Sequence, residues 1–349
     1  MTQAKTMKVA QYDAYGPARE VLRIVESPVP TPGPGDLLVK VRASSVNPID
    51  CALRSGYGHV FFESRGIAKL PIRPGRDVAG EVVAVGSQVT KFRPGDRIYA
   101  SVYYDANAQY LKLAEALAAP KPESLTYQQA AAIPFGALTV WTALVKAAGL
   151  NEQTTRGKRV IIPRGAGGVG SIGIQLIKAW GGYVASTCST RNVDLVGSLG
   201  ADVVIDYNRQ DPRELLHDFD VAFDTSFDTE QVLLDALKKH AGASYASVVT
   251  PKLKLIDQYG LEEGIKRGEQ FFADRVAAQK ALGRSYHWVF AELGGNALRA
   301  IGKLVDAGKV RPLVDQVYPL ERLAEAHERC EGAHTRGRII IDLDRSDSR

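Results

Sequence analysis

The first part of the chain contains short segments in which apolar and polar residues alternate, the pattern of strands with one buried face. Residues 37–43 place valine or alanine at positions 39, 41 and 43, and lysine or arginine at positions 40 and 42. Segments 7–15, 78–85 and 97–102 predict further strands, and the turn sequences SPVPTPGPGD (27–36) and PGD (94–96) separate some of them. Closely spaced short strands without long helices between them predict a compact β-rich domain.

A different pattern begins near residue 125, where helix-forming stretches alternate with short apolar runs. Residues 125–150 favour helix, with an interruption around Pro134 and Gly136. Strands are then predicted at 160–162, 183–187, 203–205, 219–223 and 244–249, with helical segments between them. This alternation predicts a parallel sheet with right-handed crossovers.

The last hundred residues depart from that alternation and then close the chain. Residues 251–293 break the rhythm, and we expect them to form a peripheral lobe. A helix is predicted at 296–307, followed by strand, helix and strand at 313–318, 320–330 and 338–343. The return of strand patterning after residue 306 predicts that the C-terminal segment rejoins the first domain.

One motif stands out in the α/β part of the sequence. Gly165, Gly167 and Gly170 fit G-x-G-x-x-G between an apolar strand and a helix with apolar residues at 169, 172, 176 and 180. The first glycine would permit a tight turn, the second would let backbone approach a pyrophosphate, and the third would let helix and strand pack closely. With Gly168 and Val169, this helix start offers N–H groups to a phosphate. The alternative is a glycine turn that only packs a βαβ unit.

The end of the following strand predicts which dinucleotide would bind. An NAD site has an acidic residue about twenty residues after the glycine turn, where it binds the ribose 2′-hydroxyl. Here the strand ends in Ser189, Thr190 and Arg191, and the first acidic residue after Gly170 is Asp194. An arginine attracts a 2′-phosphate and two hydroxyls can donate to it, so we predict NADPH as the cofactor. The alternative is that Arg191 is only a solvated residue at a helix start.

Composition narrows the classes of protein. Among 349 residues, 45% are apolar and 24% charged, as in ordinary globular proteins, and the net charge is +5 without a basic block. We therefore expect no nucleic-acid partner. The sequence contains no run of about eighteen apolar residues, so we expect no membrane span. The three scattered cysteines, and a start without a signal or transit pattern, lead us to expect a cytoplasmic location.

Several longer motifs resemble one family. VNPIDCALRSGYG (46–58), PGRDVAGEVVAVG (74–86) and FRPGDRIYA (92–100), with SYHWVF (285–290), resemble the medium-chain dehydrogenase/reductases, in their zinc-free quinone oxidoreductase branch. The resemblance implies an α/β protein in which a Rossmann doubly wound parallel sheet accompanies a β-rich GroES-like catalytic domain. We expect residues 1–128 to form the GroES-like domain, 129–305 the Rossmann domain, and 306–349 to return to the first. It also implies a homodimer.

The same resemblance implies the absence of a catalytic metal. Zinc-containing relatives hold the metal with cysteine or histidine at positions that correspond to Asn47, Arg76 and about Phe135 in this sequence. Asparagine, arginine and phenylalanine do not ligate zinc as cysteine, histidine or carboxylate do. We expect no metal site, and a structural ion pair between Arg76 and Asp77.

The resemblance also implies roles for residues near the reacting groups. Asn47 would position the oxygen of an acceptor, or alternatively would tie down its own loop with Asp50. Residues expected beside the nicotinamide are Thr139, Val249, Thr250 and Phe290, and Tyr207 is expected to contact the 2′-phosphate.

These observations together predict an NADPH-dependent oxidoreductase. It would transfer a hydride to a small-molecule quinone or enone without zinc, because such conjugated acceptors are already electrophilic. One alternative is a reductase of enoyl-thioester or alkenal double bonds, which uses the same hydride chemistry. Another is a non-catalytic interaction protein that binds a dinucleotide only as a structural ligand.

Overall fold

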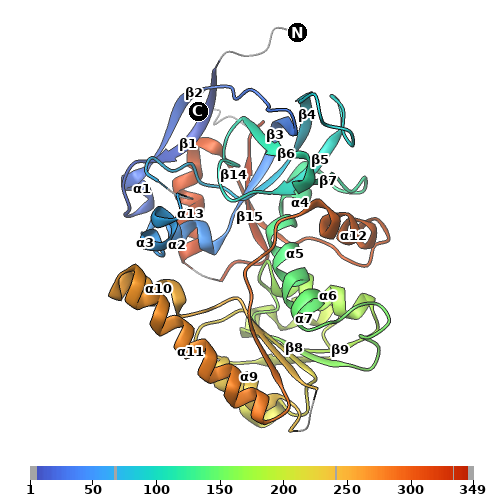
Figure 1. The fold of residues 1–349 in the computed structure, drawn as a ribbon. Coiled ribbons are helices and arrows are strands. Elements are labelled where there is room, and N and C mark those ends of the chain that lie inside the picture. Colours follow the sequence, from blue (N-terminus) through green and yellow to red (C-terminus); the bar gives the residue numbers. More distant parts are fainter. Residues whose placement is uncertain (1–5, 67–68, 240–241, 333, 345–349) are drawn as a thin grey trace. The chain divides into compact units, whose positions relative to one another are not determined.

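The computed structural model describes residues 6–66, 69–239, 242–332 and 334–344 (Figure 1). The chain divides into two compact units. The first contains Met1–Phe135, Leu293–Asp306 and Pro312–Arg349, and the second contains Gly136–Glu292 and Ala307–Arg311.

The first unit is built on a mainly antiparallel sheet with the strand order β14-β15-β3-β4-β5-β7, in which β6 also pairs with β3. A separate antiparallel pair joins β1 (Thr6–Tyr12) to β2 (Leu22–Pro28). The sheet strands are β3 (Asp36–Val46), β4 (Asp77–Val85), β5 (Arg97–Ser101), β6 (Tyr110–Ala114), β7 (Ala118–Pro120), β14 (Val314–Pro319) and β15 (Arg338–Asp342). In β3 the predicted apolar face is buried. Lys40 and Arg42 on the other face are half-buried and not fully exposed, because strands pair with β3 on both edges.

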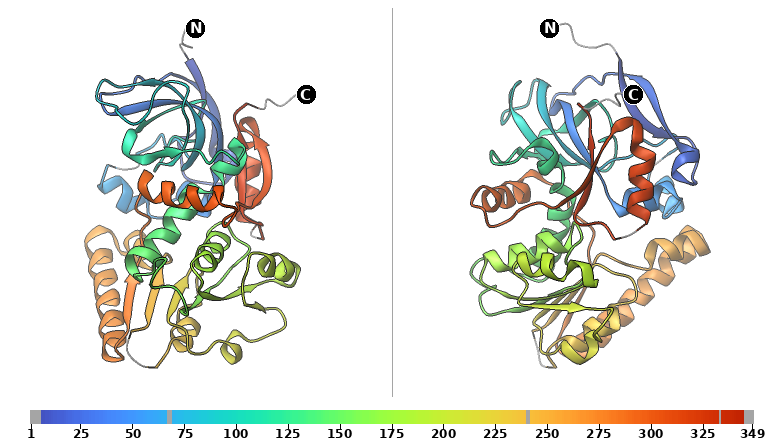
Figure 2. Two further views of the ribbon diagram at one scale, coloured as in Figure 1. Left: turned by 90° about the vertical axis from the view of Figure 1, so that its right-hand side faces the viewer. Right: turned by 180° about the vertical axis from the view of Figure 1, so that it is seen from behind.

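Short helices cover this sheet. They are α1 (Ala18–Val21), α2 (Pro48–Arg54), α3 (His59–Ser64), η1 (Glu115–Leu117), α4 (Tyr127–Ala131), α12 (Gly295–Asp306), η4 (Leu320–Arg322) and α13 (Leu323–Glu331). One core cluster joins Tyr12 of β1, Cys51 of α2, Leu323 of α13 and Ile341 of β15. Figure 2 shows α13 in red beside the strands that end the chain. Burial of this shared apolar surface holds the two ends of the chain in one unit.

The second unit contains a parallel sheet with the strand order β10-β9-β8-β11-β12-β13. The strands are β8 (Arg159–Ile162), β9 (Tyr183–Cys188), β10 (Val203–Asp206), β11 (Val221–Asp224), β12 (Ser244–Ser247) and β13 (Ser285–Trp288). The order reverses between β8 and β11, which is the doubly wound Rossmann arrangement. All the strand pairings are parallel, so the carboxyl ends of these strands share one edge.

The helices of the second unit connect these strands. They are α5 (Pro134–Val140), which begins at the boundary between the units, η2 (Trp141–Ala147), α6 (Gly170–Ala179), η3 (Thr190–Asn192), α7 (Val193–Ser198), α8 (Pro212–Leu215), α9 (Glu230–Ala236), α10 (Lys252–Tyr259) and α11 (Leu261–Ala281). α6 is buried along nearly its whole length, on more faces than the single apolar stripe predicts, whereas Val169 and Trp180 at the ends of that stripe are half-buried. Figure 2 shows α10 and α11 in orange, packed together as a pair.

Residues 251–293 are not only a peripheral lobe, as the sequence pattern predicts. Within them Ser285–Trp288 forms β13, which pairs with β12 and extends the parallel sheet. Trp288 stacks on Phe271 of α11 with ring centroids 5.9 Å apart, so the long helix lies against this strand. The short run SYHW contains two polar residues and lacks the apolar pattern of a buried strand, which is why the pattern failed there.

The division also differs from the expected boundaries at α12, which the sequence pattern assigns to the Rossmann domain. α12 packs on β7, and Tyr99 of β5 donates a hydrogen bond to the Leu298 carbonyl at 2.6 Å. Gly295 approaches the Ala118 backbone so closely that a Cβ would lie 2.0 Å from that carbonyl oxygen. These contacts place α12 in the first unit. After Asp306, β15 pairs with β3.

One apolar stretch in the described residues is long enough to cross a membrane. It is Tyr127–Ala147, which is assembled from α4, α5 and η2, and 72% of its most apolar window is buried inside the protein. Core helices of proteins that never enter a bilayer can be equally long and apolar.

Candidate functional site

The glycine turn between β8 and α6 lies at the carboxyl edge of the parallel sheet. A Cβ at Gly165 would lie 2.3 Å from Ser186 Oγ, and a Cβ at Gly170 would lie 2.5 Å from the Arg164 carbonyl oxygen. A Cβ at Gly167 would lie 3.3 Å from that same oxygen. Two of the glycines are therefore required by packing, whereas Gly167 is less crowded. This close-packed cradle, with the free N–H groups that begin any helix, fits a pyrophosphate.

The tight turn itself is made by a residue other than the expected one. Gly165 does not have a positive φ, and the left-handed position is taken by Arg164, with φ 57°. The Arg164 carbonyl accepts from Gly167 N–H at 2.9 Å, which closes the turn. The first glycine of the motif thus provides space for Ser186 and Ile174, and not backbone freedom.

The predicted 2′-phosphate residues lie at the neighbouring strand ends. Ser189, Thr190 and Arg191 follow the end of β9, and Tyr207 follows the end of β10, where its N–H donates to the Cys188 carbonyl at 3.1 Å. Ser189 is half-buried, and the other three are exposed. This group therefore presents hydroxyls and a guanidinium on one edge of the sheet, without a carboxylate among its members.

The predicted nicotinamide residues are partly gathered at the same edge. Val249 and Thr250 follow the end of β12, and Phe290 follows β13, with 59% of its surface exposed. Thr139 lies on α5 and is buried. Ser247 Oγ accepts from Val249 N–H at 3.1 Å and donates to the Val249 carbonyl at 2.8 Å, which fixes the turn after β12.

Asn47 is the N-cap of α2 in the first unit and lies inside a buried hydrogen-bond network. Its side-chain Nδ2 donates to Asp77 Oδ2 at 3.0 Å and to Ser45 Oγ at 3.2 Å. Its backbone N–H donates to Asp50 Oδ2 at 2.9 Å, as in a capping box. Both amide hydrogens are committed and the side chain is fully buried, so the geometry favours the loop-fixing alternative for Asn47 over contact with an acceptor.

Arg76 pairs with a different carboxylate from the one expected. Its Nε donates to Asp50 Oδ1 at 3.1 Å, whereas Asp77 accepts from Ser45, Asn47 and the Phe135 N–H. The Arg76 guanidinium also lies over the Phe135 ring, 5.2 Å from its centroid. Burial raises the pKa of Asp50 above its usual value, and the charge of Arg76 partly opposes that rise. Asp50 and Arg76 thus form the ion pair, and Asp77 holds the surrounding backbone.

This network does not fit a zinc ion. Of the three positions that would hold the metal, one is a hydrogen-bonded amide, one a buried cation and one a phenylalanine. Within the described ranges, no group of three or more histidine, cysteine, aspartate or glutamate side chains is arranged to bind a metal.

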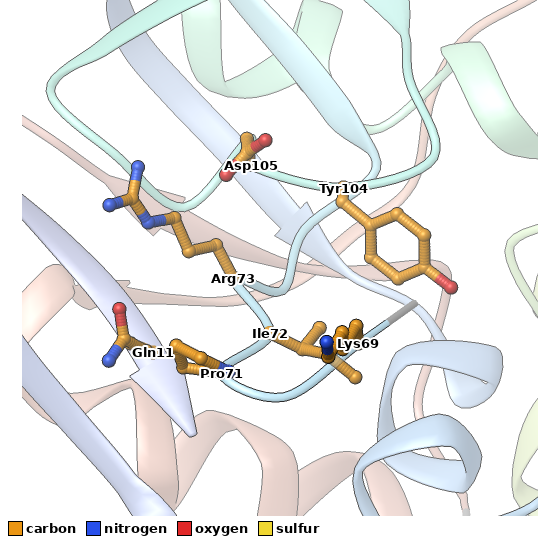
Figure 3. Close-up of a pocket in the computed structure, with 7 residues that line it drawn as sticks. All are labelled: Gln11, Lys69, Pro71, Ile72, Arg73, Tyr104 and Asp105. Carbon is orange, nitrogen blue, oxygen red and sulfur yellow. The ribbon is translucent and has the colours of Figure 1, made fainter. Parts of the chain in front are cut away.

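A pocket of about 370 Å³ lies in the first unit, and Tyr104 is one wall of it (Figure 3). The Tyr104 ring faces the Arg76 guanidinium at 5.7 Å, and its Oη is buried without a hydrogen-bond partner among the described residues. Burial also raises the pKa of this hydroxyl, so it stays protonated. The rest of the lining is largely polar or charged. The lining residues are Gln11, Lys69, Pro71, Ile72, Arg73, Tyr104 and Asp105.

Comparison with known proteins gives a consistent result. The family described as alcohol dehydrogenase GroES-like domain matches residues 33–139, and zinc-binding dehydrogenase matches residues 199–341. The human mitochondrial NAD(P)H oxidoreductase RTN4IP1 is 37% identical over 352 residues, which covers 95% of this chain and 88% of the relative. The chloroplastic quinone-oxidoreductase QR1 of Triphysaria versicolor is 30% identical over 351 residues, covering 97% and 99% respectively.

A solved structure agrees over nearly the whole chain. The quinone oxidoreductase from Coxiella burnetii matches with a TM-score of 0.80 at 30% identity, covering 97% of this chain and 100% of that one. The chain therefore belongs to the medium-chain dehydrogenase/reductase family, as an oxidoreductase of the quinone oxidoreductase type that uses a nicotinamide dinucleotide.

Proposed function

We propose that this protein is an NADPH-dependent reductase that transfers a hydride to a quinone or a similar conjugated carbonyl, without zinc. The proposed preference for NADPH is supported by the end of β9, where Ser189, Thr190 and Arg191 replace the carboxylate of an NAD site. The names of the relatives support the acceptor class, since several are quinone oxidoreductases.

The bound dinucleotide would supply the hydride, and the chain supplies position and charge. The turn at Gly165–Gly170 and the start of α6 would hold the pyrophosphate, because backbone N–H groups there point to one side. Arg191, with Ser189, Thr190 and Tyr207, would hold the 2′-phosphate. Thr139, Val249, Thr250 and Phe290 would border the nicotinamide. Asn47 acts as a positioning residue, since its hydrogen bonds fix the start of α2.

Independence from zinc is supported by the Asp50–Arg76 pair. A buried guanidinium at this position would repel a divalent cation, and the adjacent Asp77 is already committed to three donors. The test is elemental analysis of protein purified without added metal. We expect far less than one zinc per chain and no loss of activity on treatment with a chelator. Stoichiometric zinc that leaves together with activity would refute this part.

The acceptor class is tested by a panel of substrates. NADPH oxidation would be followed with 1,4-benzoquinone and 1,4-naphthoquinone, with a simple enone, and with an enoyl thioester, each corrected for the rate without enzyme. We expect kcat/KM for a quinone to exceed that for the other acceptors by about tenfold or more, or about 1.4 kcal/mol in the barrier. Preference for the enoyl thioester would select the double-bond reductase instead. Cofactor binding without turnover of any acceptor would select a non-catalytic interaction protein.

We also propose that the protein is cytoplasmic and forms a homodimer. Cys51, Cys188 and Cys330 form no disulfide, which supports a reducing compartment, and the dimer rests on the family resemblance. Cell fractionation and light scattering in solution test these two points.

A further inference from the structure

An arginine occupies a backbone conformation that suits glycine at the centre of the nucleotide-binding turn. Arg164 has φ 57°, in the left-handed region that most side chains disfavour. Elsewhere in the described residues, the non-glycine positions with positive φ are aspartates and one histidine, and these residue types tolerate that region well. A glycine at position 164 would relieve this strain, because glycine adopts positive φ without cost. The surrounding sequence is already glycine-rich, yet this position carries an arginine.

The Arg164 backbone is held against the end of the neighbouring strand. Its N–H lies 3.4 Å from Thr187 Oγ1, and the next N–H, that of Gly165, donates to the Thr187 carbonyl at 3.1 Å. Thr187 stands two residues before Ser189. Arg164 therefore begins the turn on the side that faces the β9 strand end, where the adenosine ribose binds in this fold.

The Arg164 side chain is exposed, and its guanidinium has no hydrogen-bond or ion-pair partner among the residues that the structure describes. No aspartate or glutamate occurs in 163–170, from the end of β8 into the start of α6, or in 187–193, from the last residues of β9 to the first residue of α7. Nothing in these two segments would neutralise the cation, and it stands at the same sheet edge as Arg191.

We propose that Arg164 is a specificity-determining residue that binds the 2′-phosphate of NADPH together with Arg191. The two guanidiniums would approach that phosphate from the ends of adjacent strands, β8 and β9. A phosphate monoester has enough oxygen acceptors for two guanidiniums, and each such bond is charge-assisted. The inference rests on the proposed NADPH preference and adds to it a residue that also forms the turn.

The test is Arg164→Gly, because glycine accepts the backbone conformation and removes only the side chain. Affinity would be measured by calorimetry for NADPH, NADH, 2′,5′-ADP and 5′-ADP, so that the result does not depend on turnover. We expect NADPH and 2′,5′-ADP to bind about tenfold to a hundredfold more weakly, as for loss of one charge-assisted bond. NADH and 5′-ADP should bind as before. The melting temperature should be unchanged or higher.

Two further variants complete the experiment. Arg164→Lys keeps the charge and should retain part of the NADPH preference. Arg156→Ala removes an exposed arginine that precedes the N-terminal end of β8, whereas Arg164 follows the C-terminal end. It changes the net charge by the same amount as Arg164→Gly and should leave all four affinities unchanged.

The outcomes separate this inference from the proposed function. Equal losses for NADPH and NADH in Arg164→Gly would place the side chain at the pyrophosphate and overturn the inference. Unchanged affinities would also overturn it, even if wild type prefers NADPH. A wild type that binds NADH or 5′-ADP as tightly as its 2′-phosphorylated counterpart would instead refute the proposed cofactor preference.

Discussion

Arg76 Nε lies 3.1 Å from Asp50 Oδ1, and these two side chains are only 6% and 4% exposed. The pair joins the residue directly before β4 to the first turn of α2, and Arg76 is one of the positions that the family resemblance assigns to a zinc ligand. A buried ion pair contributes little net stability, but removal of one partner leaves the other charge uncompensated.

We therefore predict that Asp50→Ala lowers the free energy of unfolding by about 3–5 kcal/mol. Arg76→Met should cost a similar amount, and the double variant should lose clearly less than the sum. Urea unfolding of the four proteins measures this coupling. The exposed pair Glu263–Arg267 on α11 is the control, and its removal should cost less than about 1 kcal/mol. Additive losses at Asp50 and Arg76 would show that the pair is not coupled.

His327 on α13 predicts a loss of stability in mild acid. The ring is fully buried and neither nitrogen has a hydrogen-bond partner among the described residues. Burial, with a smaller effect of Arg54, lowers the pKa of His327 to about 3. Between this value and the ordinary value near 6.5, the unfolded chain binds a proton that the folded chain does not. Stability therefore rises with pH through that window and is complete above it.

At pH 5 this difference costs about 2 kcal/mol relative to neutral pH. His327→Leu should flatten the pH dependence of the unfolding free energy between about pH 5 and 7. His217, which is exposed, provides the control: His217→Leu should leave the profile as in wild type. If the His327→Leu profile retains the full slope, another group is responsible.

The glycine turn predicts two opposite results for similar substitutions. Gly165→Ala should destabilise the fold by about 1–3 kcal/mol, because its Cβ would lie 2.3 Å from Ser186 Oγ. Gly167→Ala should cost clearly less stability than Gly165→Ala, since its Cβ meets only the Arg164 carbonyl oxygen at 3.3 Å, but it should weaken NADPH and NADH alike. Thermal unfolding and calorimetry measure the two effects. Unchanged affinity for both cofactors in Gly167→Ala would mean that no pyrophosphate approaches this residue.

The sequence predicts much of the second unit because strands buried on both faces are short apolar runs. β8, with Val160, Ile161 and Ile162, was predicted for this reason. β13 was not, because its Trp288 side chain and its polar neighbours are stabilised by packing against α11, which no local pattern reports.

The site was predicted in outline, and its details depend on contacts distant in sequence. The glycine spacing identifies the turn, yet the left-handed conformation of Arg164 follows from hydrogen bonds with Gly167 and with β9. The partner of Arg76 is Asp50, 26 residues away, and not its neighbour Asp77. The sequence shows an arginine directly before the first glycine of the motif. Only the backbone geometry shows that this arginine takes the left-handed position of the turn, so the sequence alone did not identify Arg164 as a candidate.

Arg191 provides a test of the cofactor at the strand end. Arg191→Ala should weaken NADPH binding by about tenfold to a hundredfold, because a charge-assisted hydrogen bond contributes roughly 1.5–3 kcal/mol. NADH binding should be almost unchanged. Calorimetry with both nucleotides on wild type and variant gives the comparison. Equal losses for the two cofactors would assign Arg191 a structural role instead.

The stoichiometry of the reaction is the sharpest test of hydride transfer from NADPH to a quinone without zinc. Chelator-treated enzyme would be mixed without oxygen with NADPH and 1,4-benzoquinone, and both NADPH loss and hydroquinone formation would be quantified against an enzyme-free control. We expect one hydroquinone to form for each NADPH oxidised, with a higher kcat/KM for NADPH than for NADH. No oxidation of NADPH above the enzyme-free rate, or oxidation only after zinc is restored, would contradict it.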